Sequence, residues 1–148
     1  MRIITAAAIA VALATTSARS AAQAPKITWG PAPAVFPAGA KFAVLQGDPS
    51  KAAMYTVRLD LPSGYTVPPH SHPTDELITV ITGNFMVGMG DKVEPAKMMT
   101  LPQGGFINAV ANMHHYARAK GHTVVQVSGM GPFTMTYANP ADDPSKKK

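Results

Sequence analysis

Three residues of the types that bind metal ions lie close together near the middle of the chain: His70, His72 and Glu76. Alternate residues of a β-strand point to the same side, so both imidazoles face one way if residues 64–72 are extended. Glu76 follows Pro73-Thr74-Asp75, a short turn that can return its carboxylate to the same face. Two imidazoles and a carboxylate are typical ligands of divalent transition metals.

The chain of 148 residues contains no cysteine. This excludes a disulfide framework and a thiolate site, so any metal must be held by nitrogen and oxygen ligands. The sequence therefore predicts one divalent transition metal as cofactor, with zinc, copper, manganese, nickel and iron as candidates.

The elements that must position these residues read as short β-strands. Fourteen prolines and twelve glycines indicate many turns, which is typical of all-β domains. Residues 54–61 alternate, with Tyr55, Val57, Leu59 and Leu61 on one face. About ten strands are predicted, among them 41–45, 54–61, 77–81, 85–89, 98–101, 106–110, 115–119, 123–127 and 133–137. Gly83-Asn84 predicts a hairpin turn between two of them.

No helical period is visible after the first segment. Many short antiparallel strands must close or stack to hide their edges, so we expect a single-domain barrel or jelly roll. We place the barrel at residues 40–138, an extended N-terminal arm at 23–39 and a loose C-terminal tail at 139–148.

Residues 1–22 resemble a signal peptide. A positive start at Arg2 precedes an uncharged apolar run and a small-residue stretch. Cleavage after Ala22 fits the small-x-small rule, whereas cleavage after Ala24 would leave Pro25 first. The run is too short to span a bilayer, so we expect no membrane contact after cleavage and a location in the periplasm or the medium.

The formal charge of +5 does not indicate a nucleic-acid-binding protein. Arg2 and Arg19 lie in the predicted signal peptide, and Lys146 to Lys148 form a terminal run. Without these five residues the basic and acidic residues balance. A nucleic-acid partner needs a basic cluster on a folded face, and the sequence predicts none.

The segment around the two histidines matches the first cupin motif. That motif reads Gly, five residues, His, one residue, His, three or four residues, Glu, six residues, Gly. These positions are Gly64, His70, His72, Glu76 and Gly83. The chain therefore resembles small single-domain bacterial cupins, and this implies the cupin-type double-stranded β-helix, a jelly-roll barrel.

The second cupin motif is incomplete. Counted from Gly104, its proline, glycine and asparagine are replaced by Val110, Asn112 and Ala119, whereas its histidine is present as His115. Asn112 can replace glycine in a left-handed turn. The resemblance thus implies a metal held by His70, His72, Glu76 and His115. His114 is the alternative third histidine, and the motif register favours His115.

The resemblance implies a small-molecule ligand or substrate, rich in oxygen, at this centre. If the protein is an enzyme, an oxygenase or a redox-neutral lyase, isomerase or decarboxylase is expected, with Glu76 or an inward-facing Tyr65 as base. The alternatives are a non-catalytic binding or sensing module with a structural metal, and a metal-free polar cluster. Gln126 is a candidate hydrogen-bond partner of a ligand histidine. A homodimer is possible, by resemblance.

Overall fold

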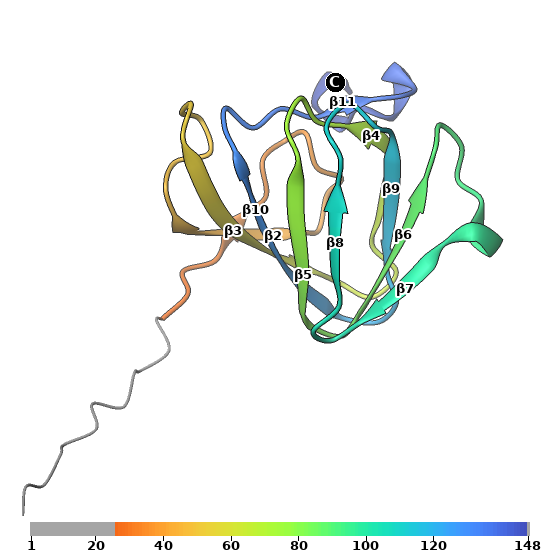
Figure 1. Ribbon diagram of the computed structural model, residues 1–148, viewed down its shortest axis with the longest axis horizontal. Helices are drawn as coiled ribbons and strands as arrows, with labels where there is room; N and C mark the ends of the chain where they lie inside the picture. Colours follow the sequence, from red (N-terminus) through yellow and green to blue (C-terminus); the bar gives the residue numbers. More distant parts are fainter. Residues whose placement is uncertain (1–25, 148) are drawn as a thin grey trace, which may run out of the picture.

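The computed structural model describes residues 26–147, which form two antiparallel β-sheets packed face to face (Figure 1). The strands of this part are β1 (Gly30–Pro31), β2 (Lys41–Gln46), β3 (Met54–Leu61), β4 (Thr66–Ser71), β5 (Glu76–Thr82), β6 (Asn84–Met89), β7 (Met99–Pro102), β8 (Phe106–Ala109), β9 (His115–Ala119), β10 (Thr123–Met130) and β11 (Thr136–Tyr137). Its only helical elements are three 3-10 turns, η1 (Pro95–Lys97), η2 (Pro140–Asp142) and η3 (Pro144–Lys146). Within these residues no helix is long and apolar enough to cross a membrane. The predicted signal peptide, residues 1–22, lies outside them.

The strand order brings together segments that are far apart in the sequence. The six-stranded sheet has the order β1-β2-β3-β10-β5-β8, and the five-stranded sheet has the order β11-β4-β9-β6-β7. β10 therefore lies between β3 and β5, and β9 lies between β4 and β6. Because late strands are inserted between early ones, the two sequence motifs meet inside the barrel.

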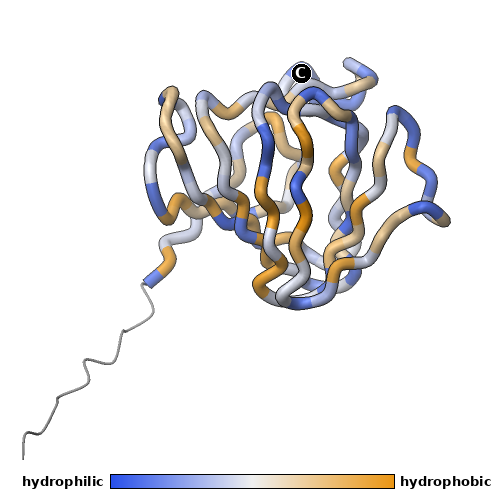
Figure 2. The backbone as a smooth tube through the Cα atoms, viewed as in Figure 1, coloured by the Kyte–Doolittle hydropathy of each residue, from blue (hydrophilic) through white to orange (hydrophobic). Residues whose placement is uncertain are grey.

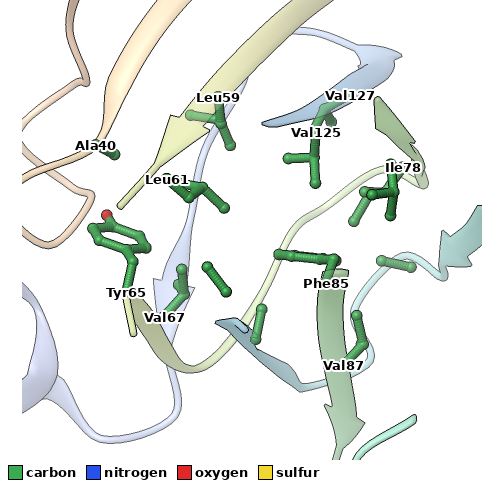
Figure 3. Packing of buried hydrophobic residues seen from close by; sticks show 14 of the residues in the cluster. Ala40, Leu59, Leu61, Tyr65, Val67, Ile78, Phe85, Val87, Val125 and Val127 are labelled. Atoms are coloured by element: carbon green, nitrogen blue, oxygen red, sulfur yellow. The ribbon is translucent and has the colours of Figure 1, made fainter. Parts of the chain in front are cut away.

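Apolar side chains on the inner faces of the sheets form one core. On β3, alternate residues from Tyr55 to Leu61 are buried, as their spacing predicts. Figure 3 shows Leu59 and Val125 of the larger sheet on the side of the core opposite Tyr65 and Val87. Hydrophobic and hydrophilic residues alternate along several strands in Figure 2. Complete burial of a valine or leucine side chain contributes about 1.5–3 kcal/mol, so this core stabilises the barrel around the site.

The turn at Gly83 connects the two sheets. Gly83 has φ +81°, and a Cβ at this position would lie 2.4 Å from the carbonyl oxygen of His122, so only glycine fits. The predicted hairpin at Gly83-Asn84 is nevertheless wrong, because β5 pairs with β10 and β8, whereas β6 pairs with β9 and β7. The local residues specify the turn, but the chain then passes to the other sheet, where the Asn84 carbonyl oxygen accepts hydrogen bonds from the Lys120 N–H and the Thr123 hydroxyl.

Both ends of the described chain are attached to the sheets. In the arm, β1 pairs with β2, and the Phe36 ring stacks on Phe133 with ring centroids 5.7 Å apart. The segment predicted as a loose tail contains η2 and η3, where Asn139 and Asp143 each accept a hydrogen bond from the backbone N–H two residues on. In Figure 1 this segment lies beside β11 and β4.

Gly88 on β6 is packed against an aromatic ring. Gly88 lies opposite Tyr116 on β9, and a Cβ at Gly88 would lie 2.2 Å from the nearest ring carbon. Tyr116 is only 1% exposed, and its hydroxyl accepts a 3.0 Å hydrogen bond from the Glu94 N–H. The ring is therefore enclosed and has little room to move.

We expect Gly88→Ala to lower the free energy of unfolding by about 1–3 kcal/mol, because the added methyl group overpacks this contact. Urea denaturation measures the effect. Gly30→Ala is the matched control, since a Cβ there would have only the Phe42 carbonyl oxygen, at 4.0 Å, within reach. Equal destabilisation of the two variants would contradict the packing described.

Candidate metal centre

Four buried polar residues gather near β11, whose Tyr137 is the cross-strand partner of His70 on β4. His70, near the end of β4, and His115, the first residue of β9, are cross-strand partners in the smaller sheet. His72 lies just beyond the end of β4. Glu76 is the first residue of β5 and comes from the larger sheet. The sequence predicts that a short turn brings Glu76 close to His70 and His72. In the structure this approach also depends on the packing of the two sheets, because β4 and β5 belong to different sheets.

The three imidazoles form a compact group. Ring centroids are separated by 4.3 Å for His70 and His115, 5.0 Å for His70 and His72, and 5.4 Å for His72 and His115. One ring nitrogen of each histidine lies within 4.8 Å of those of the other two. Glu76 lies beside this group, with Oε2 3.3 Å from His72 Nε2, but outside the set of atoms that are all within 4.8 Å.

The protein backbone fixes the orientation of all three rings. His70 Nδ1 lies 2.7 Å from the carbonyl oxygen of Pro68, His72 Nδ1 lies 2.7 Å from that of Thr134, and His115 Nδ1 lies 3.1 Å from that of Met113. A carbonyl oxygen only accepts hydrogen bonds, so Nδ1 carries the proton in each neutral ring. Each Nε2 therefore has a free lone pair. This is the arrangement found in histidines that bind metals.

Burial holds the histidines neutral. It is the largest cause of the lowered pKa of His70, to about 3, and neighbouring His115 lowers it further. Burial likewise lowers the pKa of His72 to about 4 and depresses the pKa of His115. In the opposite direction, burial raises the pKa of Glu76 to about 7. At neutral pH the site is thus poor in protons, and its nitrogen atoms are available as ligands.

The contact between His72 and Glu76 bears on whether these residues fit a cation. His72 Nε2 is buried and has no hydrogen-bond partner among the described residues, although Glu76 Oε2 is only 3.3 Å away. Since Nδ1 of His72 holds the proton, a lone pair of nitrogen faces a carboxylate oxygen. A buried polar atom of this kind is costly unless it is paired. A proton on Glu76, whose pKa is about 7, or a divalent cation held by both residues would pair these two atoms, so the residues present fit a divalent cation.

Hydrogen bonds between the loops tie the two motifs together. Asp75, next to Glu76, accepts hydrogen bonds from the Ala111 N–H at 2.8 Å and from the Asn108 side chain at 3.0 Å. The Asn112 N–H donates to the His72 carbonyl oxygen at 2.7 Å. Asn112 has φ +62°, which confirms the left-handed turn predicted where the second motif lacks its glycine. The loop before His115 is therefore held against His72 and Glu76.

A cavity of about 50 Å³ lies between the sheets beside these residues. Its lining includes His70, His72, Glu76 and His115, and the remaining residues are apolar apart from Tyr55. The cavity exceeds the volume that a single water molecule needs, about 15 Å³ by this kind of measure. It is too small for a large ligand in this conformation.

The other predicted candidates lie away from this group. His114 pairs with Asp91 near the surface, and this agrees with the register that favours His115. Tyr65 does not line the cavity; its hydroxyl donates to the Pro37 carbonyl oxygen at 2.6 Å, and Figure 3 shows its ring beside Leu61 and Val67.

Gln126 does not contact a histidine either. It lies on the outward-facing positions of β10 and accepts a 3.2 Å hydrogen bond from Arg58. Backbone carbonyl oxygens, and not Gln126, accept the hydrogen bonds from the ligand histidines. The acceptor for His72 is the carbonyl oxygen of Thr134, 62 positions away, and no residue type in the sequence marks such a main-chain acceptor. Tyr55 was not predicted as a site residue, although its place on the inward face of residues 54–61 was a usable signal.

Solved structures with a similar fold include proteins described as cupins. A protein of Methylibium petroleiphilum PM1, provisionally described as an acetylacetone dioxygenase, is 23% identical, with a TM-score of 0.62 over 80% of this chain and 79% of that one. A cupin 2 domain-containing protein of Halorhodospira halophila is 17% identical, with a TM-score of 0.58 over 72% and 79% of the two chains. KdgF from Halomonas sp. is 17% identical, with a TM-score of 0.55 over 70% and 86%. The predicted single-domain, all-β cupin fold is thus confirmed.

No protein-family model matches the sequence. No curated protein matches it significantly.

The pKa shifts of the site should make the metal-free protein less stable as the pH falls below neutrality. Below about pH 7 the three histidines of the unfolded chain take up protons, because their ordinary pKa is near 6.5. In the folded chain burial lowers the pKa of His70 to about 3 and that of His72 to about 4, and it holds the pKa of His115 below its ordinary value. Glu76 acts in the opposite direction. Burial raises the pKa of Glu76 in the folded chain to about 7. The contribution of Glu76 to the free energy of unfolding is therefore complete below pH 4.5 and is lost as the pH rises through 7. Three histidines outweigh one carboxyl group between pH 6.5 and 5.

We therefore expect stability in the presence of EDTA to fall by about 1–2 kcal/mol per pH unit between pH 6 and 5. Urea denaturation at several pH values measures it. A free energy of unfolding that stays constant or increases over this interval would show that the histidines are not buried as neutral groups.

Proposed function

We propose that the protein binds one divalent transition metal ion through Nε2 of His70, His72 and His115, with Glu76 as the fourth ligand, and that it uses the metal to hold a small organic molecule by its oxygen atoms. The observation that carries the proposal is the set of hydrogen bonds from all three Nδ1 atoms to backbone carbonyl oxygens. These bonds leave three unprotonated nitrogen atoms in one buried group.

The chemistry of the donor set supports a transition metal. Imidazole suits zinc, copper, iron and nickel, whereas magnesium and calcium prefer oxygen ligands. A divalent metal bound here would act as a Lewis acid toward oxygen atoms of the ligand. The apolar wall of the cavity would exclude water from this contact. Glu76 is the one carboxyl group in the lining, and it is the candidate base when it is released from the metal.

The cavity favours ligand binding over a purely structural metal. A structural site is closed by its ligands, whereas a site that binds molecules keeps open space next to the metal. The cavity of about 50 Å³ reaches all four proposed ligands.

The proposal also includes export to the periplasm or the medium, on the basis of residues 1–22. Outside the cytosol, the affinity order of the divalent metals favours copper and zinc.

His115→Ala should abolish stoichiometric metal binding, whereas His114→Ala should retain it. The two positions are adjacent, but only His115 belongs to the buried group. Elemental analysis of the purified proteins gives the metal content. Added metal at about 100 times its dissociation constant should stabilise the wild type by about 2.7 kcal/mol, and this gain should be lost in His115→Ala.

The comparison with and without EDTA is made within each variant, so that any loss of stability from the alanine itself cancels. Equal metal content and an equal metal-induced rise of the melting temperature in His115→Ala and wild type would contradict the proposed ligand set.

Asp75→Ala should weaken metal binding without removing a ligand. The Asp75 carboxylate holds the loop before His115 against the turn before Glu76, and loss of such a supporting contact typically reduces metal affinity by about tenfold or more. A competition titration with a chromogenic chelator measures the affinity. Asp60→Ala is the control, because Asp60 pairs with His122, which is not in the group. An unchanged metal affinity in Asp75→Ala would mean that the hydrogen bonds of Asp75 do not position the ligands.

A further inference from the structure

Tyr55 occupies a special position in the wall of the cavity. Gly129 on β10 is the cross-strand partner of both Tyr55 on β3 and Glu76 on β5. The three residues therefore share the inner face of the larger sheet at one level, because directly opposite residues of an antiparallel pair point to the same side. Tyr55 is thus two strands away from the proposed carboxylate ligand, with only a glycine between them.

The glycine allows the tyrosine to reach across. A Cβ at Gly129 would lie 3.0 Å from the Tyr55 hydroxyl oxygen and 3.3 Å from the ring carbon that bears it. The hydroxyl end of Tyr55 therefore lies over β10, on the side of Glu76, in space that a larger residue at position 129 would occupy. Burial and the Glu76 carboxylate both raise the pKa of Tyr55, so the phenol keeps its proton.

The Tyr55 hydroxyl is available as a donor. Its oxygen makes no hydrogen bond to any other residue of the described chain, whereas the hydroxyls of Tyr65, Tyr116 and Tyr137 each donate to a backbone carbonyl oxygen. Tyr55 is only 2% exposed. The oxygen is not among the fully enclosed unpaired atoms of the described chain, so it can meet water or an oxygen atom of a ligand.

Elimination leaves Tyr55 as the donor for such a ligand. The polar residues that line the cavity are Tyr55, Glu76 and the three histidines. The Nδ1 protons of the histidines are held by backbone carbonyl oxygens, and their Nε2 atoms are proposed to bind the metal. All other lining residues are apolar. Among the side chains of the lining, only Tyr55 offers an uncommitted O–H or N–H group that is not on a proposed ligand.

We propose that the Tyr55 hydroxyl orients the ligand of the cavity by donating a hydrogen bond to one of its oxygen atoms, and that this ligand has its oxygen atoms at one end and an apolar remainder. The inference rests on the proposed function. A ligand with hydroxyl groups along its whole length would leave most of them unpaired against the apolar wall, and each unpaired group is unfavourable. A small carboxylate or carbonyl compound fits both requirements.

The test uses the full protein loaded with Co²⁺, whose visible absorption changes when a ligand binds. Acetate is the probe that offers a metal-binding oxygen and a second oxygen as acceptor. Imidazole is the control probe, because it binds metals through nitrogen and has no acceptor left once bound. Tyr55→Phe should weaken acetate binding by about tenfold, the effect of one hydrogen bond to a charged group, while imidazole and Co²⁺ bind as in the wild type.

Tyr65→Phe is the matched control variant. It removes a hydroxyl that donates to Pro37 outside the cavity, so it should lower the melting temperature by about 4 °C and leave acetate binding unchanged. Tyr55→Phe should show the reverse pattern, with a melting temperature close to that of the wild type. A purely structural role of Tyr55 would not produce a loss that is selective for acetate.

Each other outcome overturns a defined part of the argument. Equal acetate affinity in Tyr55→Phe and wild type, or no acetate binding by the Co²⁺-loaded wild type, refutes the inference and leaves the metal site intact. A loss of Co²⁺ affinity in Tyr55→Phe as large as the loss of acetate affinity would assign the hydroxyl to Glu76 instead. Failure of the wild type to bind Co²⁺ would refute the proposed function itself.

Discussion

The orientation of three imidazole rings by backbone carbonyl oxygens is the interaction on which the site depends. Each Nδ1 proton is held at 2.7 to 3.1 Å from a carbonyl oxygen, and this fixes both the tautomer and the direction of Nε2. If one ring turned over, it would present an N–H group to the centre instead of a lone pair. The backbone thus determines the chemistry, because a carbonyl oxygen has no proton to give and holds the same tautomer at every pH at which the ring is neutral.

The barrel makes these carbonyl oxygens available at the site. Pro68 and Pro69 on β4 have no N–H group, and the register with β9 shifts between Val67 and His70. The Pro68 carbonyl oxygen is thereby free to accept from His70. The carbonyl oxygen of Thr134 belongs to the irregular segment before β11 and that of Met113 to the loop before β9. All three acceptors are thus found where the regular ladder is interrupted, since a carbonyl within a complete ladder is already paired.

The sequence was sufficient to predict the elements with strong alternation. The strands at 54–61 and 115–119 have the predicted limits. Buried positions alternate in the first, whereas in the second Tyr116 is buried as well as His115 and Ala117. The strand predicted at 133–137 is shorter, with only Thr136 and Tyr137 in a ladder. Phe133 instead donates its N–H to the Pro49 carbonyl oxygen. The apolar pattern indicates burial there, but burial against a loop and burial within a sheet have the same pattern.

For the site, the sequence could supply the side chains but not their partners. His70, His72 and Glu76 follow from spacing, and His115 follows from the motif register. The hydrogen bond from His72 joins residues 62 positions apart and ends on a main-chain atom, which every residue has. No residue type marks such an acceptor. The crossover at Gly83 has the same cause, since a left-handed turn is equally suited to a hairpin and to a passage between sheets.

The small number of polar groups around the cavity also limits how strongly the cavity can discriminate between ligands. An apolar wall discriminates weakly between ligands that differ by one methylene group, by about 1–3 kcal/mol, whereas a buried group that must form a hydrogen bond discriminates much more strongly. Here the strongest discrimination falls on the few polar groups at one end: the histidine nitrogens, Glu76 and Tyr55. Under the proposed function, the site would therefore distinguish ligands by their oxygen-bearing end through hydrogen bonds and metal contacts, and by the remainder only through its size. The absence of a side chain at Gly129 is part of this arrangement, because a Cβ there would lie 3.0 Å from the Tyr55 hydroxyl oxygen.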